Sequence, residues 1–271
     1  MGAKISALFI YPVKGCRGIA LPLARVTERG LARDREWMVV DVAGRFVTQR
    51  TEPRLASITT AITATALELG APGAEPLQIP LDHAGIAGTV TVWGDTVPCI
   101  DQGPAAAAWL SARLNGIHRL VRFDPAARRR CNPEYAGASG AHTAFADGYP
   151  LLVLSEASLD DLNGRLAAPL RVDRFRPNLL LSGIDAYDED YIDEIVSGEV
   201  ALKMVKPCTR CEVTTIDQQT LERGAEPLRT LAGYRHNALL DGIAFGMNAI
   251  VAAGAGATLA RAAPVTYSYR F

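Results

Sequence analysis

The sequence predicts a mainly β protein, a β-barrel or mixed sheet with a few helices, and three observations predict it. Short runs rich in Val, Ile and Thr recur between Gly and Pro residues. The predicted strands do not alternate with helices, which disfavours a doubly wound parallel sheet. The chain has 271 residues, of which 49% are hydrophobic and 21% charged, so it can form one large globular domain or two small ones.

In the first half, the predicted elements are strands followed by one helix. Residues 41–44 predict a hairpin turn, because Asp and Gly suit a tight turn between two apolar pairs. Gly103 and Pro104, followed by an Ala-rich run, predict a helix that ends near residue 114. We expect a domain boundary soon after this helix, dividing the chain into residues 1–120 and 121–271. The predicted strands are residues 5–11, 23–29, 36–42, 58–65, 89–93 and 97–101.

The second half begins with a long segment that has no periodicity. Residues 124–147 contain Arg128, Arg129 and Arg130 and two prolines, and predict an irregular loop that acts as a lid or linker. Ser155, followed by apolar residues at helical spacing, predicts a capped amphipathic helix. A short helix is expected at residues 227–234. The predicted strands are residues 151–154, 179–181, 200–205, 212–216, 245–251 and 265–269.

The charge balance excludes several classes of partner. Lys and Arg number 28 against 29 Asp and Glu, a net charge of -1, so no global field attracts nucleic acid or anionic lipid. Any anion site must be a local cluster. The five cysteines, an odd number, argue against a disulfide scaffold and for a reducing compartment. Without a signal peptide or a long uninterrupted apolar stretch, we expect a cytoplasmic protein with no membrane span.

Several common enzyme motifs are missing from the sequence. It contains no G-x-G-x-x-G, Walker A, H-E-x-x-H or G-x-S-x-G pattern. The four histidines are far apart in sequence and do not support a histidine metal site. They are His83, His118, His142 and His236.

The most informative short segment is KPCTRC, residues 206–211, with Cys208 and Cys211 in C-x-x-C spacing. A thiolate is a soft metal ligand, and the flanking Lys206 and Arg210 would offset its negative charge. The pair alone is compatible with buried structural cysteines, a structural zinc site, or a redox or catalytic role. A zinc site lacks a second close pair of cysteines. A thioredoxin-like site is disfavoured because the residues after the motif predict a strand.

Five motifs resemble one family in sequence and order. KPCTRCEVTTID at residues 206–217 and FRPN at 175–178 resemble the signature of MOSC domains. YPVKGC at 11–16 and LARDREW at 31–37 resemble the β-barrel domain that precedes MOSC in the mitochondrial amidoxime reducing components and their bacterial relatives. DGYP at 147–150, leading into LSEASL at 154–159, is the fifth. The resemblance implies an N-terminal MOSC-associated β-barrel domain at residues 1–120 and a MOSC β-barrel domain at 121–271.

The resemblance also implies a pterin-based molybdenum cofactor, molybdenum-molybdopterin. In such a centre two dithiolene sulfurs, oxo or hydroxo ligands and one protein thiolate hold the metal. By motif position that thiolate belongs to Cys211, whereas Cys208 is not expected to be a ligand.

The cofactor carries a phosphate and an oxygen-rich metal centre, so its burial requires local cations and backbone donors. We expect Pro177 to hold Arg176 extended, because the residue before proline avoids the α region. Gly15 stands where relatives often have Ser, so a side-chain contact is lost there. The expected contacts are the cations Lys14, Arg35, Arg176 and Arg210, hydrogen bonds from Asn178 and Thr209, and backbone groups of Gly148 and Tyr149.

The implied activity is the reduction of N-hydroxylated compounds such as amidoximes, hydroxylamines or N-hydroxylated bases. The redox chemistry belongs to the cofactor, while Cys211 anchors the metal and Arg210 and Lys14 stabilise oxyanionic ligands. The sequence shows no C-x4-C-x2-C cluster, so we expect a separate electron donor of the ferredoxin, flavoprotein or cytochrome type. The basic run 128–130 is one surface where an acidic donor could dock.

Two alternatives from other functional classes stay open. MOSC domains are also thought to carry molybdenum cofactor or sulfur without an organic substrate of their own. A zinc-stapled β-barrel interaction module is a third hypothesis and ranks last.

Overall fold

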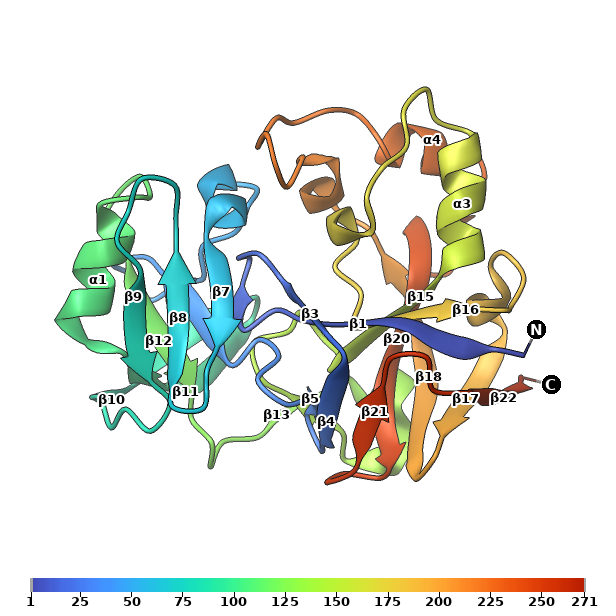
Figure 1. Ribbon diagram of the computed structural model, residues 1–271, viewed down its shortest axis with the longest axis horizontal. Helices are drawn as coiled ribbons and strands as arrows, with labels where there is room; N and C mark the ends of the chain where they lie inside the picture. The colour runs from blue at the N-terminus through green and yellow to red at the C-terminus, as the bar shows by residue number, and fades with distance from the viewer. Residues whose placement is uncertain (1, 271) are drawn as a thin grey trace.

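The computed structural model describes residues 2–270, which form two lobes built mainly of strands (Figure 1). The predicted mainly β class is confirmed. Neighbouring strands are antiparallel in almost every pair, as expected for a mixed sheet rather than a doubly wound one. The larger lobe carries both described ends of the chain, and the smaller lobe carries the first long helix.

The larger lobe is organised around one mixed sheet, in the strand order β22-β17-β18-β20-β15-β16-β1-β3, with β19 paired to β20. Only β15 and β16 are parallel in this sheet. Its strands are β1 (Lys4–Ile10), β3 (Ile19–Leu21), β15 (Leu151–Ser155), β16 (Leu179–Ser182), β17 (Ile192–Ser197), β18 (Val200–Thr209), β19 (His236–Asn237), β20 (Gly242–Ala253) and β22 (Thr266–Tyr269).

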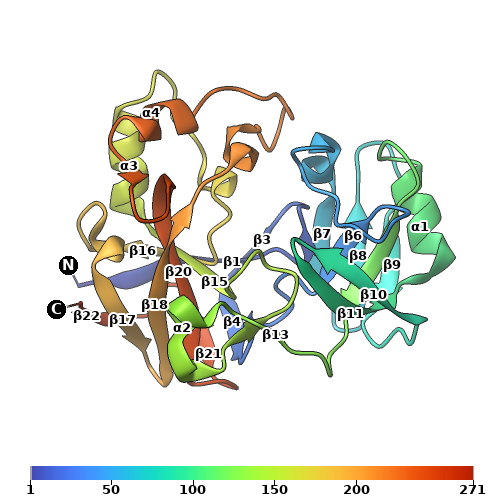
Figure 2. The same cartoon turned by 180° about the vertical axis from the view of Figure 1, so that it is seen from behind.

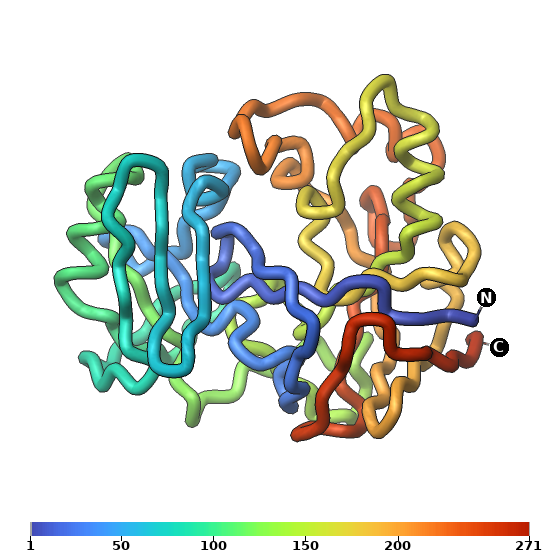
Figure 3. The backbone as a smooth tube through the Cα atoms, viewed as in Figure 1, coloured from blue at the N-terminus to red at the C-terminus, as the bar shows by residue number. Residues whose placement is uncertain are grey.

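The first strand of the chain belongs to the sheet of the second half. Strand β1 pairs antiparallel with β16, and its buried Ile5 and Leu8 join a core otherwise made largely by later strands. The tube in Figure 3 shows the chain entering through the larger lobe before it crosses to the smaller one. The boundary between residues 120 and 121 stays a prediction, but the main core of the larger lobe contains residues from both sides of it.

Three short strands extend the larger lobe: β4 (Leu23–Thr27), β5 (Gly30–Leu31) and β21 (Thr258–Ala260). Two helices, α3 (Glu156–Gly164) and α4 (Leu228–Ala232), pack beside the main sheet over a core that contains Leu162, Phe175 and Phe245. The predicted cap of α3 is confirmed, since the Ser158 N–H donates to Ser155 Oγ at 3.0 Å.

The smaller lobe consists of two sheets and helix α1 (Gly103–Ser111), seen from behind in Figure 2. Its core surrounds the fully buried Trp37, whose Nε1–H donates to Gln102 Oε1 at 3.2 Å. One sheet has the order β10-β11-β12-β6-β2 and the other β7-β8-β9. Their bounds are β2 (Val13–Lys14), β6 (Trp37–Val40), β7 (Thr59–Ile62), β8 (Ala66–Gly70), β9 (Leu77–Pro80), β10 (Ala87–Val92), β11 (Asp95–Asp101) and β12 (Arg119–Phe123).

The sequence analysis missed four strands of four or more residues: β8, β9 and β12 in the smaller lobe and β17 in the larger one. Strand β8 reads ALELG, and Ala, Leu and Glu favour helices, so pairing with β7 and β9 overrides the local preference. Strand β17 reads IDEIVS, and its two consecutive acidic residues, which are half-buried, interrupt the apolar alternation typical of a strand.

The prediction of an irregular loop at residues 124–147 is wrong in part. This segment connects the lobes and contains β13 (Arg129–Arg130), α2 (Pro133–Ala136), the 3-10 turn Gly137–Ser139 and β14 (His142–Thr143). The Asn132 side chain caps α2 by accepting the Glu134 N–H at 3.0 Å. The other 3-10 turns are Pro53–Ser57, Val172–Arg174, Asp188–Asp190 and Glu212–Thr215.

The predicted strand at residues 212–216 is also wrong, because Glu212–Thr215 form a 3-10 turn named η5. Val, Thr and Ile favour strands, but two threonine hydroxyls bond locally to the backbone. Thr214 Oγ1 donates to the Cys211 carbonyl at 2.9 Å and Thr215 Oγ1 donates to the Glu212 carbonyl at 2.8 Å. The chain after Cys211 therefore turns instead of pairing.

Candidate functional site

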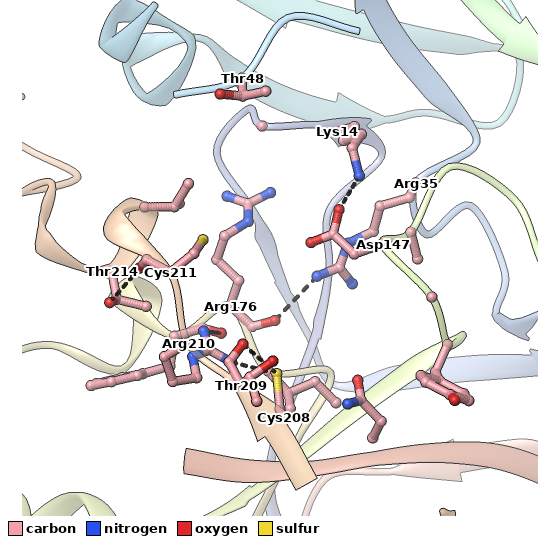
Figure 4. Close-up of a pocket in the computed structure, with 18 of the residues that line it drawn as sticks. Lys14, Arg35, Thr48, Asp147, Arg176, Cys208, Thr209, Arg210, Cys211 and Thr214 are labelled. Carbon is pink, nitrogen blue, oxygen red and sulfur yellow. Dashed lines mark hydrogen bonds and ion pairs between the residues drawn. The ribbon is translucent and has the colours of Figure 1, made fainter. Parts of the chain in front are cut away.

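A pocket of about 430 Å³ lies between the two lobes, and Figure 4 shows residues that line it. The larger lobe contributes the end of β18, the loop before β16 and the segment 146–152. The smaller lobe contributes the residues around Lys14 and the stretch 46–50. In Figure 4, Thr48 lies across the cavity from Cys208 and Cys211.

Every residue that the motifs predicted for the site lines this one pocket. Five separate sequence segments meet there, and folding brings them together from opposite halves of the chain. These residues are Lys14, Gly15, Arg35, Gly148, Tyr149, Arg176, Asn178, Thr209, Arg210 and Cys211. Their individual roles toward a cofactor stay predictions.

Cys211 presents an exposed thiol to the pocket. It follows β18 and begins η5, where its carbonyl accepts the Thr214 N–H at 3.0 Å. In Figure 4 its sulfur points into the cavity. Because the turn holds the backbone while the side chain is open, this sulfur is placed to bind an incoming soft metal.

The other cysteines are less available than Cys211. Cys208 is half-buried, and Arg210 Nη1 donates to its sulfur at 3.0 Å. Cys16, Cys99 and Cys131 are buried, and burial raises the pKa of the Cys16 thiol to about 12. Cys211 is therefore the most accessible of the five thiols.

Arg176 is not extended, so the prediction from Pro177 is wrong. Its φ is +56°, in the region that favours glycine, and such a conformation costs roughly 1–3 kcal/mol. Tertiary contacts hold it there: its guanidinium lies 4.2 Å from the Tyr11 ring centre, and Nη1 donates to the Cys16 carbonyl at 2.8 Å. The strained backbone places this cation at the pocket.

The outer nitrogen of Arg176 is an unused donor. Its Nη2 is buried and has no hydrogen-bond partner within residues 2–270. Burial and the neighbouring Arg35 lower the pKa of Arg176 to about 10. A buried guanidinium N–H without an acceptor is costly, and an anionic ligand in the pocket would supply the missing acceptor.

The other pocket cations are compensated to different degrees. Lys14 Nζ lies 2.5 Å from Asp147 Oδ1 and also donates to the Phe145 carbonyl at 2.8 Å. Arg35 pairs with buried Asp34 at 2.6 Å. Two of the four predicted cations are therefore neutralised by carboxylates, and the uncompensated positive charge comes from the two arginines of the larger lobe.

Arg210 has no ion-pair partner in the described chain, but its guanidinium is partly engaged. Nη2 donates to the Phe175 carbonyl at 2.7 Å and Nη1 donates to Cys208, while its buried Nε is without a partner. These bonds tie the cysteine motif to the loop before β16. Arg210 thus braces the loop that carries Cys211 as well as adding charge to the pocket.

Asn178 is buried, with 1% of its surface exposed, and its side chain serves the protein itself. Its Oδ1 accepts the Leu152 N–H at 3.1 Å and Arg35 Nη1 at 3.0 Å, and its Nδ2 donates to the Phe9 carbonyl at 3.1 Å. The bonds join β1, β15 and Arg35. The contact between Asn178 and a pterin stays a prediction, and the structure shows in addition that Asn178 holds β1, β15 and Arg35 together.

We expect Asn178→Leu to destabilise the protein by about 3 kcal/mol, because it removes the side-chain partner of two buried backbone groups and one of the acceptors of Arg35. Urea unfolding followed by fluorescence would measure the change. Asn115→Ala is the matched control, since Asn115 is exposed and its side chain has no hydrogen bond in the described chain. Equal stability of both variants would contradict the bracing role.

Asp147 is a pocket residue that the sequence analysis did not select. It lies beside Gly148 in a recognised motif, but a carboxylate was not expected in an anion site. The charge and hydrogen bond of Lys14 hold the pKa of Asp147, whose side chain is largely exposed in the pocket, well below its usual range. In Figure 4 the second carboxylate oxygen is turned toward the cavity, where it can accept a hydrogen bond.

The stretch 48–50 is the second omission. The side-chain amides of Gln49 and Gln218 bond reciprocally at 3.0 and 2.9 Å, and Gln49 Nε2 donates to the Gly15 carbonyl at 2.6 Å. These contacts join the lobes at the edge of the pocket. Gln49 and its neighbours have no motif, so no sequence signal marked them.

Arg129, part of the predicted docking surface, is engaged inside the protein. Its side chain is 9% exposed and donates to Asp95 at 2.7 Å and to the carbonyls of Ala144, Ala146 and Asp147. Arg128 is exposed and lies 3.6 Å from Glu28. A docking role for the run 128–130 would therefore rest on Arg128 and Arg130 alone.

Comparison with known proteins identifies two matched regions of the chain. Residues 2–116 match the MOSC N-terminal beta barrel domain, and residues 140–257 match the MOSC domain. The chain is 37% identical over 244 residues to mitochondrial amidoxime reducing component 2 of Rattus norvegicus. It is 39% identical over 241 residues to mitochondrial amidoxime-reducing component 1 of Homo sapiens. Each alignment covers 85% of this chain and 72% of the relative.

The chain belongs to the MOSC family. The resemblance carried by the five motifs is thereby confirmed. In this MOSC protein the pocket receives residues from both matched regions, so it is a joint product of the N-terminal barrel domain and the MOSC domain. Within residues 2–270, no helix is both long and apolar enough to cross a membrane.

Proposed function

We propose that this MOSC protein is a molybdenum-cofactor-dependent reductase of N-hydroxylated compounds, namely amidoximes, hydroxylamines or N-hydroxylated bases. The single observation that carries the proposal is the exposed Cys211 thiol facing a cationic pocket. Relatives named as amidoxime reducing components, at 37–39% identity, support the choice of substrate.

The residues present fit the proposed cofactor. Cys211 offers a soft sulfur ligand, and the unpartnered Nη2 of Arg176 offers a donor for an anionic oxygen. Thr209 and Gly148 add polar groups at the pocket surface. When bound, the cofactor supplies the two-electron chemistry that removes oxygen from an N–O bond.

The remaining polar groups can orient the substrate. With its lowered pKa, Asp147 is a carboxylate at neutral pH and accepts hydrogen bonds rather than donating a proton. Its Oδ1 already accepts from Lys14, so its other oxygen is open to an N–H or O–H of the substrate. The fixed pair Lys14–Asp147 thus presents an acceptor of constant direction to the reacting group.

Each turnover would consume two electrons and two protons and release one water with the reduced product. We propose that the electrons come from a separate ferredoxin, flavoprotein or cytochrome. We also keep the cytoplasmic location as a proposal. Cell fractionation and cross-linking to a reduced donor protein would test these two points.

The experiment that tests the function combines composition with turnover. We expect the protein, purified from cells able to make the cofactor, to contain molybdenum and pterin in equal amounts. It should reduce benzamidoxime to benzamidine with reduced methyl viologen, and removal of the cofactor should abolish this activity. Stable loading without reduction, together with transfer of cofactor to an acceptor protein, would instead establish the carrier function. Zinc without molybdenum would contradict both.

A further inference from the structure

A tryptophan of the smaller lobe stands at the edge of the pocket. Trp93 follows β10 at the tip of the β10–β11 hairpin and is 47% exposed, although it is one of the largest apolar side chains. Its φ is +55°, which is unusual for a bulky residue. Neither hydrophobic burial nor backbone preference explains this placement of the indole.

Contacts with the larger lobe hold it there. The Trp93 Nε1–H donates to Asp147 Oδ1 at 3.1 Å, the same oxygen that binds Lys14. The hairpin itself is anchored next to Trp93, where Asp95 pairs with Arg129 at 2.7 Å. Because Arg129 also binds the carbonyls of the segment that carries Asp147, the hairpin with the indole is tied to the segment with the carboxylate.

The indole is part of an aromatic and cationic wall. The ring centres of Phe46 and Trp93 are 5.0 Å apart, and the Arg50 guanidinium lies 4.9 Å from the Trp93 ring centre. The Arg50 guanidinium has no ion pair or hydrogen bond within residues 2–270, although the residue lines the pocket. Exposed aromatic surface and an unpaired cation therefore face the same opening.

This wall differs in chemistry from the part of the pocket that suits the cofactor. The thiol of Cys211 and the uncompensated Arg176 belong to the larger lobe, whereas Trp93 and Arg50 belong to the smaller lobe. An organic group that enters from solvent toward Asp147 meets the indole that is bonded to that carboxylate. The open apolar surface of the indole is better suited to contact the organic part of a substrate than to contact a metal centre.

We propose that Trp93 and Arg50 are specificity-determining residues for the substrate. The planar conjugated body of an N-hydroxylated compound packs on the indole, and Arg50 favours neutral or anionic substituents over cationic ones. The inference rests on the proposed reductase function, which it deepens by naming the kind of substrate preferred.

The first test compares an aromatic with a small aliphatic substrate. In the cofactor-loaded enzyme, Trp93→Ala should raise KM for benzamidoxime about tenfold, the scale of one lost aromatic contact, and change KM for acetamidoxime less than about twofold. Trp93→Phe should recover most of the affinity, and kcat should change little. Trp109→Phe is the control, because Trp109 lies on α1 away from the pocket and bonds to the Glu75 carbonyl.

Two results of this test would overturn the role of Trp93. Equal changes in KM for both substrates would show that the indole does not recognise the aromatic ring of the substrate. A loss of molybdenum or pterin from Trp93→Ala would show that it holds the cofactor instead. Binding of benzamide, a non-reducible planar analogue, measured by calorimetry, separates this inference from the proposed function. If the enzyme does not reduce benzamidoxime but Trp93→Ala still weakens benzamide binding, the proposed binding site for planar groups is supported and the proposed reductase activity is contradicted.

The second test concerns charge and does not depend on Trp93 variants. The wild-type enzyme should bind 4-carboxybenzamidoxime with a KM at least about fivefold lower than that of the 4-trimethylammonio compound at low salt. Arg50→Gln should bring the two KM values together, while Arg50→Lys should keep them apart. If the ratio of the two KM values were unchanged in Arg50→Gln, Arg50 would not select the charge of the substituent.

Discussion

Replacement of Cys211 by alanine is expected to abolish molybdenum-dependent reduction, with a loss of about a thousandfold or more, while the fold survives. The reason is local. The thiol is exposed at the pocket, and the backbone rather than the side chain of Cys211 holds the turn η5 in place. Activity with reduced methyl viologen, molybdenum content and circular dichroism together measure the effect.

Cys208→Ala is the matched control for this prediction, because it removes a second thiol two residues before Arg210 in the same pocket. Its sulfur accepts a hydrogen bond from Arg210, so we expect a milder loss, within about tenfold. If Cys211→Ala kept activity, or if Cys208→Ala were the more damaging change, the assignment of the metal ligand to Cys211 would be wrong.

Arg176→Gln should act in opposite directions on the loaded and the empty protein. In the loaded protein it removes a charged donor of the cofactor, and a lost charge-assisted hydrogen bond of about 1.5–3 kcal/mol lowers cofactor affinity about 10- to 150-fold. In the empty protein it removes a buried charge that no carboxylate within residues 2–270 pairs, and a donor, Nη2, that has no acceptor. This gain should outweigh the lost bond to the Cys16 carbonyl, so the free energy of unfolding should rise by about 1 kcal/mol.

The pH dependence of the empty protein gives the same prediction a second readout. The pKa of Arg176 is lowered to about 10 in the folded state, so the unfolded chain binds more protons above that pH. Stability of the empty wild-type protein should therefore gain from this group as pH rises beyond about 10, and Arg176→Gln should lack this gain.

Arg174→Gln is the control for charge removal, since Arg174 is two residues away and pairs with Asp217 at 2.8 Å outside the pocket. It should not raise the stability of the empty protein and should leave cofactor content unchanged. A variant Arg176→Gln that retained full cofactor and lost stability would show that Arg176 is only a structural residue.

Several features could be predicted without coordinates because they are local or repeated in order along the chain. Alternation of β-branched residues with turn residues predicts the mainly β class, and Ser155 predicts the cap of α3. The spacing of five motifs indicates the family and places Cys211 in the site. Such signals need only neighbours in sequence or a fixed motif order.

Local preference failed where tertiary contacts or local side-chain bonds outweighed it. Thr214 and Thr215 favour a strand, but their hydroxyls bond to the backbone and close a turn. Arg176 precedes a proline and should be extended, but contacts with Tyr11 and Cys16 hold it at positive φ. Both exceptions lie at the pocket, where the fold accepts strain to position functional groups.

By itself, then, the sequence determined the class of fold, the family and the thiol on which the proposed chemistry depends. Only the tertiary structure decided which cations are free to act. Lys14 meets Asp147 across 133 positions of the chain, and Arg35 meets Asn178 across 143, so neither partner could be read from neighbouring residues. Charge compensation and burial depend on distances in space, and folding set those distances by closing two lobes around one pocket.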